Sequence, residues 1–236
     1  MPTTAQTLKP GYVLHQRAYR ETSAIVEVLT REEGRVGVVA RGVRAQRGKA
    51  RPPLQPFQRY LFGWRGRGEL MNLTSWELNG SHRYLQGSGL VSGLYLNELL
   101  VRLLQRDDPH PAVFDAYVVA LTGLAEASTR QLALRAFEKR LLSAIGYGLE
   151  LNLDVESGSP LSPATLYLYD PDAGPRPAPP NAQSGGLCVH GATLLAVDED
   201  RLETEQARRE AKGLMRALLH HYLQGRPLIS RTLLRG

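Results

Sequence analysis

The 236-residue sequence predicts an α+β multidomain protein, in which a small β-barrel precedes a mainly helical domain. Three observations predict this fold class. Short runs rich in β-branched residues fill residues 11–77, with glycine at their corners. Apolar residues recur at helical spacing after Gly80. The helical pattern then breaks at residues 151–191, where seven prolines accumulate.

Five short strands account for the N-terminal region. The runs that predict them are residues 11–15, 24–30, 36–40, 57–64 and 69–73. Their Val, Ile and aromatic residues fit a pleated, half-buried surface, and Gly34, Gly66 and Gly68 mark turns. Strands this short fit a small closed barrel, because closure removes exposed sheet edges. An OB-fold is the first candidate, and an SH3-like barrel remains open.

Helical periodicity follows the barrel. The predicted helices cover residues 95–104, 111–127, 129–145 and 203–224, with a short one near Ser230. We therefore expect a barrel domain over 1–79 and a helical domain over 80–150 plus 192–236. Residues 151–191 form an inserted Pro/Gly-rich lobe, in which Leu166-Tyr167-Leu168-Tyr169 predicts one short strand.

The positive charge lies in the first third of the chain. Residues 1–79 carry thirteen Lys and Arg against six Glu and no Asp, whereas residues 80–236 carry sixteen against seventeen acids. This asymmetry predicts a polyanion-binding module joined to a nearly neutral scaffold. The residues expected to form a continuous phosphate track are Arg17, Arg20, Arg35, Arg41, Arg44, Arg47, Lys49, Arg51, Arg59, Arg65 and Arg67.

Two further features bear on binding. Six aromatic residues are interleaved with these charges, and one or two of them are expected to face outward and stack with bases: Tyr12, Tyr19, Phe57, Tyr60, Phe62 and Trp64. A second basic cluster lies on the predicted helix 129–145 and comprises Arg130, Arg135, Lys139 and Arg140. It is read either as a solvated helix face or as a cationic rim for an acidic, hydrophobic peptide tail.

No catalytic constellation is found, so the sequence predicts a protein that is not an enzyme. It lacks a phosphate-cradling Gly-rich loop followed by Lys-Ser/Thr. The acidic pairs and runs lie at predicted helix boundaries, where capping explains them. Cys188 and His190 are zinc-ligand types, but a structural zinc site needs four ligands. The single cysteine and the lack of a long apolar segment predict a soluble cytoplasmic protein.

Several motifs together resemble the RecO recombination-mediator family of bacterial DNA repair. The similar segments are Tyr19-Arg20-Glu21-Thr22-Ser23-Ala24-Ile25-Val26, Leu29-Thr30-Arg31-Glu32-Glu33-Gly34, Val39-Ala40-Arg41-Gly42-Val43-Arg44, Leu54-Gln55-Pro56-Phe57, Tyr95-Leu96-Asn97-Glu98-Leu99-Leu100, Phe137-Glu138-Lys139-Arg140-Leu141-Leu142-Ser143-Ala144-Ile145-Gly146-Tyr147 and Arg226-Pro227-Leu228-Ile229-Ser230-Arg231-Thr232-Leu233-Leu234. Each is moderately specific, and their joint order and spacing over most of the chain carry the resemblance.

The resemblance implies an OB-fold, a helical domain and an inserted zinc-finger-like lobe, in a protein without catalytic turnover. It implies binding of single- and double-stranded DNA, annealing of complementary strands, and loading of RecA onto strands coated by single-strand-binding protein. RecR, and in some members RecF, are the implied partners. The acidic C-terminal tail of single-strand-binding protein is expected at the cluster around Arg135 to Arg140.

One departure from the family concerns the lobe. Where many relatives place two Cys-x-x-Cys pairs, this sequence has Asp154 and Ser157, then Cys188 and Gly191. No zinc or other cofactor is therefore expected, and the lobe is degenerate. We expect it to keep its shape by packing around Leu151, Leu153, Leu166, Leu168 and Leu187.

Two other function classes remain open. A protein–protein adaptor would use the basic barrel to bind acidic proteins, and an RNA-binding protein would use the same fold, since OB-folds serve both nucleic acids. A nuclease or hydrolase is disfavoured, because the basic region has no Asp and, apart from His15, no His.

Overall fold

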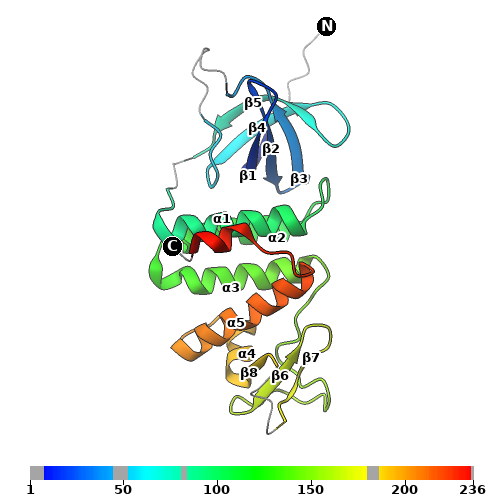
Figure 1. The fold of residues 1–236 in the computed structure, drawn as a ribbon, viewed down its shortest axis with the longest axis vertical. Coiled ribbons are helices and arrows are strands. Elements are labelled where there is room, and N and C mark those ends of the chain that lie inside the picture. Colours follow the sequence, from blue (N-terminus) through cyan, green and yellow to red (C-terminus); the bar gives the residue numbers. More distant parts are fainter. Residues whose placement is uncertain (1–7, 45–52, 81–83, 180–185, 235–236) are drawn as a thin grey trace. The chain divides into compact units, whose positions relative to one another are not determined.

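The structure is a computed structural model that describes residues 8–44, 53–80, 84–179 and 186–234 (Figure 1). The chain forms two compact units, which are described separately: Met1–Asp115 with Ile229–Gly236, and Ala116–Leu228. The sequence-based boundaries at residues 79, 150 and 191 remain predictions about domains. None of the helices in the described ranges is long and apolar enough to cross a membrane.

A closed five-stranded barrel dominates the first unit. Its strands are β1 (Lys9–Tyr19), β2 (Ser23–Thr30), β3 (Gly34–Ala40), β4 (Arg59–Arg65) and β5 (Met71–Leu78). They close in the order β1-β2-β3-β5-β4, with β3 and β5 parallel and the other neighbours antiparallel. This is the expected OB-like barrel. Its interior is filled by alternate residues, chiefly Val26, Val28, Val36, Val38, Tyr60, Phe62 and Trp76.

Helix α1 (Gly87–Leu103) docks on the barrel through a buried asparagine. The β1 register shifts between Val13 and His15, and the Asn97 amide donates hydrogen bonds to the carbonyl oxygens of Leu14, at 2.9 Å, and Val13, at 3.4 Å. A β-bulge disrupts the ladder and leaves polar backbone groups that need partners. Asn97 supplies these partners and thereby fixes where the helix sits on β1.

Helix α1 begins eight residues before its predicted start at Tyr95. Its first turns contain Gly89, Ser92 and Gly93, which are buried although they lack the large apolar side chains that mark a helix face. A Cβ at Gly93 would lie 2.7 Å from the Phe57 ring. These small residues are therefore needed for close packing, which hydrophobic periodicity does not reveal.

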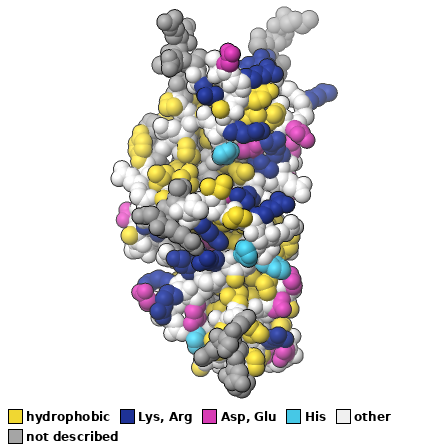
Figure 2. All heavy atoms as spheres, viewed as in Figure 1, with side chains coloured by type: hydrophobic (Ala, Val, Ile, Leu, Met, Phe, Trp, Pro, Cys, Tyr) yellow, Lys and Arg dark blue, Asp and Glu magenta, His cyan; other side chains and the backbone are white. Residues whose placement is uncertain are grey.

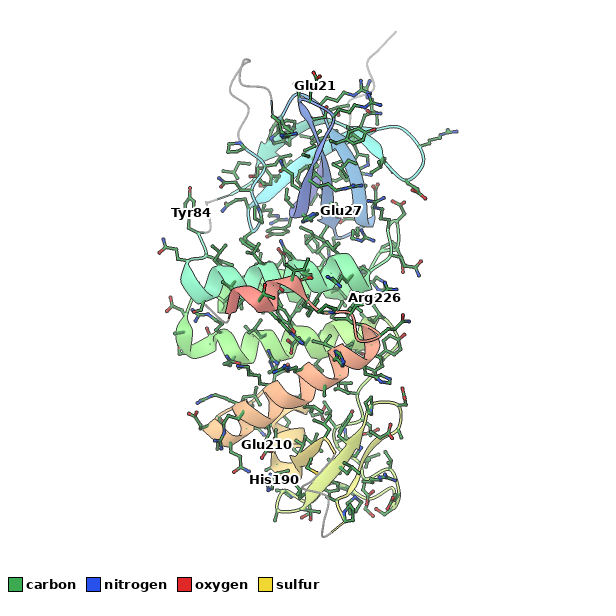
Figure 3. The ribbon with its side chains drawn as sticks, viewed as in Figure 1. Glu21, Glu27, Tyr84, His190, Glu210 and Arg226 are labelled. Carbon is green, nitrogen blue, oxygen red and sulfur yellow. The ribbon has the colours of Figure 1, made fainter. Side chains whose placement is uncertain are left out.

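The first unit also contains a buried carboxylate shared by two arginines. Glu27 on β2 accepts hydrogen bonds from Arg35 Nη1 at 2.7 Å and from Arg106 Nε at 3.2 Å, and Arg106 Nη2 also contacts it (Figure 3). A Cβ at Gly37 would lie 2.8 Å from the Arg106 guanidinium, so glycine makes room for it. Burial alone would raise the pKa of Glu27, but Arg106 and then Arg35 outweigh it and hold the pKa below its ordinary value.

A second carboxylate holds the C-terminal 3₁₀ helix η2 (Ile229–Leu234) against α1. Glu98 accepts hydrogen bonds from the backbone nitrogens of Ile229 and Ser230, at 2.9 and 2.8 Å, and from Ser230 Oγ at 2.6 Å. An anion suits a helix N-terminus, where backbone N–H groups lack intrahelical partners. The Arg231 guanidinium lies 5.7 Å from the Tyr95 ring centre. The predicted short helix near Ser230 is thus present as a 3₁₀ helix.

The second unit is built on helices α3 (Ala127–Ala144), α4 (Gly191–Asp198) and α5 (Glu205–Tyr222), and α2 (Pro111–Gly123) spans the division between the units. Helix α5 packs against both α3 and α4 (Figure 1). The sequence pattern predicted α2, α3 and α5 but not α4. Helix α4 is short and apolar along most of its length, so it has no polar face to produce an amphipathic period.

The lobe contains a three-stranded antiparallel sheet, where the sequence predicted one strand. Strands β6 (Leu166–Asp170), β7 (Gly174–Pro177) and β8 (Cys188–His190) pair in the order β7-β6-β8. The extra strands were missed because β8 has three residues and β7 contains two prolines.

The predicted core of the lobe is largely wrong. Leu151 is buried, but Leu153 is 39% exposed, and Leu166, Leu168 and Leu187 are only half-buried. Strand β6 instead turns Tyr167 and Tyr169 inward, and they are buried along with Leu161 and Val189. Alternate residues of a strand face opposite sides, so burying the two tyrosines places the two leucines on the other face.

Replacing Glu27 with Gln should destabilise the protein by about 3 kcal/mol at pH 7, because two partly buried guanidinium groups lose their counter-charge. The pKa of Glu27 is lowered on folding, so this contribution is present above the ordinary carboxyl pKa and is lost as pH falls through the lower, folded value. Urea unfolding of both proteins between pH 7 and pH 3 measures this. A stability gap that stays constant over this range would contradict the role of the charge.

Gly34 and Gly42 form a matched pair for substitution by Ala, since both have φ of +69°. At Gly42 a Cβ would meet nothing within 4 Å, whereas at Gly34 it would lie 2.1 Å from the Asp108 carbonyl oxygen. Gly42→Ala should therefore cost about 1–2 kcal/mol of backbone strain, and Gly34→Ala at least about 2 kcal/mol more. Equal melting temperatures for the two variants would refute this close approach.

Candidate nucleic-acid interface

The strand register places two arginines in one row across the outer wall of the barrel. Arg17 lies opposite Ile25, Ile25 opposite Val39, Val39 opposite Asn72, and Asn72 opposite Arg65. Residues directly opposite each other on neighbouring strands share a face. The row crosses all five strands of the closed barrel, so it follows the curved wall for about 19 Å at a strand spacing of about 4.8 Å, and Ile25 within it is buried. Arg17, Asn72 and Arg65 are exposed, so both ends of the row present a guanidinium to solvent.

More arginines lie at the turns that border this row. Arg20 is in the β1–β2 turn, with its guanidinium 5.2 Å from the Tyr19 ring centre. Arg41 and Arg44 follow β3, and the Arg44 backbone nitrogen donates to the Thr22 carbonyl at 3.0 Å, which joins the two turns. Arg67 is in the turn between β4 and β5. OB-folds bind oligonucleotides on the face of strands 2 and 3 and with the loops that join strands 1 and 2 and strands 4 and 5. The turns that carry Arg20 and Arg67 are these two loops.

We call this surface the basic face and define it as Arg17, Arg20, Arg41, Arg44, Arg65 and Arg67. All six are exposed, and within the described residues none forms an ion pair. Figure 2 shows Lys and Arg side chains on the barrel and also on the helical part of the visible face. Glu21, labelled in Figure 3, is an acid at the tip of the β1–β2 turn. Unpaired positive charge of this kind attracts a polyanion.

Not every predicted arginine joins the basic face. Arg35 was wrongly assigned to the track: it pairs with the buried Glu27, and its Nε donates to the Leu104 carbonyl at 3.1 Å. Arg59 is exposed but pairs with Tyr12 in the β1–β4 ladder, away from the row of Arg17. Arg47, Lys49 and Arg51 lie outside the described residues. The DNA-binding role of the remaining arginines stays a prediction.

The aromatic residues of the barrel are mainly core residues. Tyr12, Phe57, Tyr60 and Phe62 are buried. Tyr19 and Trp64 are half-buried, and each has a cation near its ring, Arg20 and Lys9 respectively. Tyr19 borders the basic face and is the aromatic side chain best placed there to stack with a base.

The predicted cationic rim on α3 is largely engaged in ion pairs and hydrogen bonds within the second unit, although Arg140 stays exposed. Arg135 is buried and pairs with the fully buried Glu138 at 3.0 Å. Lys139 donates to the Val197 and Asp198 carbonyls at the end of α4, and both Lys139 and Arg140 pair with Asp200. Arg130 donates to the Leu124 carbonyl at 3.1 Å. The sequence spacing was right, but the acids that neutralise these charges come from the same helix and from the distant α4–α5 connection.

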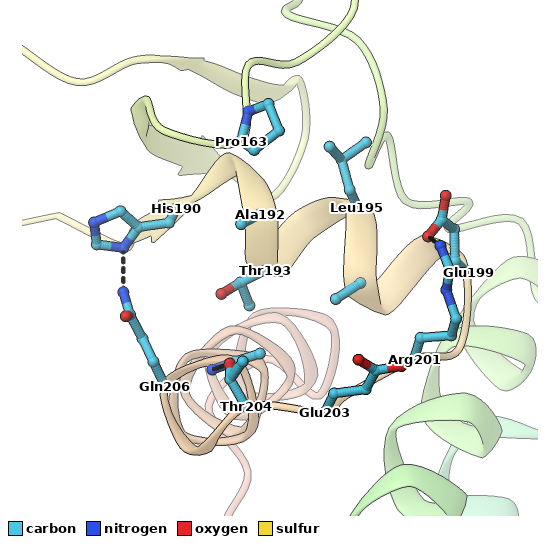
Figure 4. Close-up of a pocket in the computed structure, with 12 residues that line it drawn as sticks. Pro163, His190, Ala192, Thr193, Leu195, Glu199, Arg201, Glu203, Thr204 and Gln206 are labelled. Atoms are coloured by element: carbon cyan, nitrogen blue, oxygen red, sulfur yellow. Dashed lines mark hydrogen bonds and ion pairs between the residues drawn. The ribbon is translucent and has the colours of Figure 1, made fainter.

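A groove of 640 Å³ lies between α4 and α5 (Figure 4). At one end, the Gln206 amide lies 3.1 Å from His190 Nδ1, and Glu210 accepts hydrogen bonds from the His190 backbone nitrogen and from Thr193 Oγ1. The groove lining mixes both charges with apolar groups: Leu195, Ala196, Ala207, Glu199, Arg201 and Glu203. Because acids stand beside Arg201, the groove offers an acidic peptide no charge complementarity.

The four degenerate zinc positions do not fit a metal. Asp154 accepts hydrogen bonds from the Glu156 nitrogen at 2.9 Å and from Ser157 Oγ at 2.7 Å, and the Ser157 bond, then the Glu156 bond, lowers its pKa. Gly191 has no side-chain donor, and a Cβ there would lie 2.1 Å from the Ser162 carbonyl oxygen. Within the described residues no group of three or more His, Cys, Asp or Glu could hold a metal ion.

Asn72 is the residue of this surface that sequence reasoning missed. The predicted fifth strand covered residues 69–73, whereas β5 runs from Met71 to Leu78. Alternation in that longer strand, with Leu73 inward and Asn72 outward, is the signal that identifies it. Only the parallel β3–β5 pairing shows that Asn72 lies beside Val39.

Comparison with known proteins agrees with this architecture. The family model described as Recombination protein O N terminal matches residues 4–82, and that described as Recombination protein O C terminal matches residues 86–232. The protein named DNA repair protein RecO from Methylococcus capsulatus is 48% identical over 229 residues, which are 97% of this chain and 93% of that protein. The protein of the same name from Nitrosococcus oceani is 46% identical over 228 residues, which are 96% of this chain and 92% of that protein. The protein of that name from Cupriavidus pinatubonensis is 42% identical over 226 residues, 96% of this chain and 78% of its own length. The chain therefore belongs to the RecO family of DNA repair proteins.

Proposed function

We propose that this protein is a recombination mediator that binds single- and double-stranded DNA on the basic face and anneals complementary strands without catalytic turnover. The observation that carries the proposal is the row from Arg17 to Arg65, bordered by Arg20 and Arg67 in the turns that OB-folds use for oligonucleotides. Guanidinium groups suit phosphate oxygens, with which they form bidentate, charge-assisted hydrogen bonds.

Binding through the backbone fits a mediator that acts at any sequence. Phosphate contacts fix the position of the protein but carry no sequence information directly. Strands that are partly neutralised and held at high local concentration pair faster, so annealing requires positive surface and simultaneous engagement rather than a catalytic group.

The proposal includes partners that family membership supports. The protein would act with RecR, and with RecF and RecA in some settings, to load RecA onto DNA coated by single-strand-binding protein. The acidic tail of that coating protein remains a proposed partner, and the α3 cluster remains its predicted docking place, where the tail would compete with Asp200 for Lys139 and Arg140. The proposed compartment is the cytoplasm, in association with chromosomal DNA.

Replacing Arg17 and Arg65 with Ala should weaken binding of a single-stranded oligonucleotide and flatten its dependence on salt. Each lost contact removes about 0.7 from the slope of log K against log salt, so the slope should fall by about 1.4. Fluorescence anisotropy from 50 to 300 mM salt, with matched DNA and RNA strands, measures this. Stronger binding of RNA than DNA would contradict a repair role.

The matched control is Lys9→Ala with Arg31→Ala, which removes the same charge from two cations that have acidic partners. Lys9 pairs with Glu33, and Arg31 pairs with Asp115 at 3.0 Å, so both charges are already neutralised. This control should keep most of the affinity. Equal losses in the two variants would mean that net charge, not the basic face, determines binding.

The proposal includes no zinc, because hydrogen bonds of Asp154 and the packing of Gly191 occupy the former ligand positions. Dialysis against EDTA should therefore leave both the melting temperature and the DNA affinity unchanged. Stoichiometric zinc in the purified protein, or a lower melting temperature after chelation, would refute this expectation.

A further inference from the structure

One face of helix α5 carries a stripe of basic residues. Arg209, Lys212, Arg216 and His220 are separated by three, four and four positions, and all are exposed. At about 100° per residue they fall within an arc of about 80°. The opposite face is buried in the second unit, through Ala207, Ala211, Leu214, Met215, Leu218 and Leu219. We call these four residues the α5 stripe.

The charges of the stripe have no acidic partner among the described residues. Arg209, Lys212 and Arg216 form no ion pair there. Their neighbour Arg208 behaves differently, since it donates to the Leu202 and Glu203 carbonyls at 3.0 and 2.7 Å. Like charges three or four positions apart destabilise a helix by about 0.2–0.5 kcal/mol per pair. The stripe therefore contributes nothing to stability within the second unit.

A glycine borders the stripe, about 20° outside its arc. Gly213 has ordinary helical backbone, and a Cβ there would meet nothing within 4 Å. Neither a turn nor packing requires glycine, although it costs about 1 kcal/mol relative to Ala inside a helix. Glycine does permit a ligand to approach the backbone closely. Gly213 thus leaves a gap beside Arg209 and Arg216, its neighbours four positions before and three positions after it on the helix surface, and a bound chain can enter this gap.

The chemistry of this face favours a phosphate chain over a peptide. It carries no aromatic or large aliphatic side chain between Glu205 and His220, so it cannot anchor a hydrophobic tail. What it offers is a line of three cations about 10 Å long, from Arg209 to Arg216, at a rise of about 1.5 Å per residue. Charge without apolar anchors is the pattern of sequence-independent backbone binding.

We propose that the α5 stripe binds the sugar-phosphate backbone of a second DNA strand while the basic face holds the first. This inference rests on the proposed function, since annealing requires two strands on one protein. It adds a second binding surface, on the helical unit, with Arg209, Lys212 and Arg216 as phosphate ligands and Gly213 as the point of close approach.

The test uses the full chain with three alterations of the stripe. Arg209, Lys212 and Arg216 are replaced together with Ala, and Gly213 is replaced separately with Glu and with Gln. Glu and Gln have similar shape and similar helix propensity, so the two Gly213 variants differ mainly in charge. The control replaces Arg176, Arg201 and Arg226 with Ala, which removes three exposed charges that are scattered over the same unit.

Two readouts are measured: annealing of complementary oligonucleotides, and energy transfer between two labelled non-complementary strands held on one protein. For the triple Ala variant we expect at least a tenfold slower annealing rate and loss of the energy transfer. The salt slope for the second strand should fall by about 2, from three contacts of about 0.7 each. Gly213→Glu should impair both readouts more than Gly213→Gln, and the scattered control should resemble the wild type.

The outcomes separate this inference from the proposed function. If the wild type binds no DNA, both fail. If the wild type anneals and the Arg17/Arg65 variant is impaired, but the stripe variants anneal normally, only the α5 stripe is refuted. A stripe variant that binds DNA normally but loses an acidic protein partner also overturns it. Circular dichroism of each variant confirms that the helix is intact.

Discussion

The buried carboxylate of Glu27 divides the arginines of the first unit into structural and exposed groups. Arg35 and Arg106 both converge on it, because a half-buried guanidinium needs a counter-charge and hydrogen-bond acceptors. Lys9 and Arg31 also meet acids, Glu33 and Asp115. The arginines of the basic face have no such acids in the described structure. The excess charge of this unit is therefore polarised rather than spread evenly.

Strand pairing in the closed barrel brings arginines from separate strands onto one surface. Arg17 and Arg65 are forty-eight positions apart in the sequence, yet three intervening strands place them in one row. The parallel β3–β5 pairing is the step that joins the two halves of the barrel. A shift of one residue in the pairing of β1 or β4 would turn that whole strand over and move Arg17 or Arg65 to the core side. The hydrophobic interior opposes such a shift and so also keeps these two arginines on the outer face.

The lobe keeps its shape through packing and local hydrogen bonds. Hydrogen bonds from Glu156 and Ser157 to Asp154 organise the turn after Leu153. The inward tyrosines of β6 supply buried apolar area, and Tyr167 Oη also accepts a hydrogen bond from the Ser162 nitrogen at 2.9 Å.

The sequence by itself determined the five-stranded barrel, the helices α2, α3 and α5, and the confinement of excess positive charge to the first third, because periodicity and composition are local properties. It missed α4 and the strands β7 and β8, which are too short or too uniform to show a period. Only the tertiary structure decided which cations are available. Arg35, Arg135, Lys139 and Arg140 look like binding residues until Glu27, Glu138 and Asp200 are seen beside them. Partners that come from other elements depend on how the chain folds back on itself, and no spacing along the sequence records that.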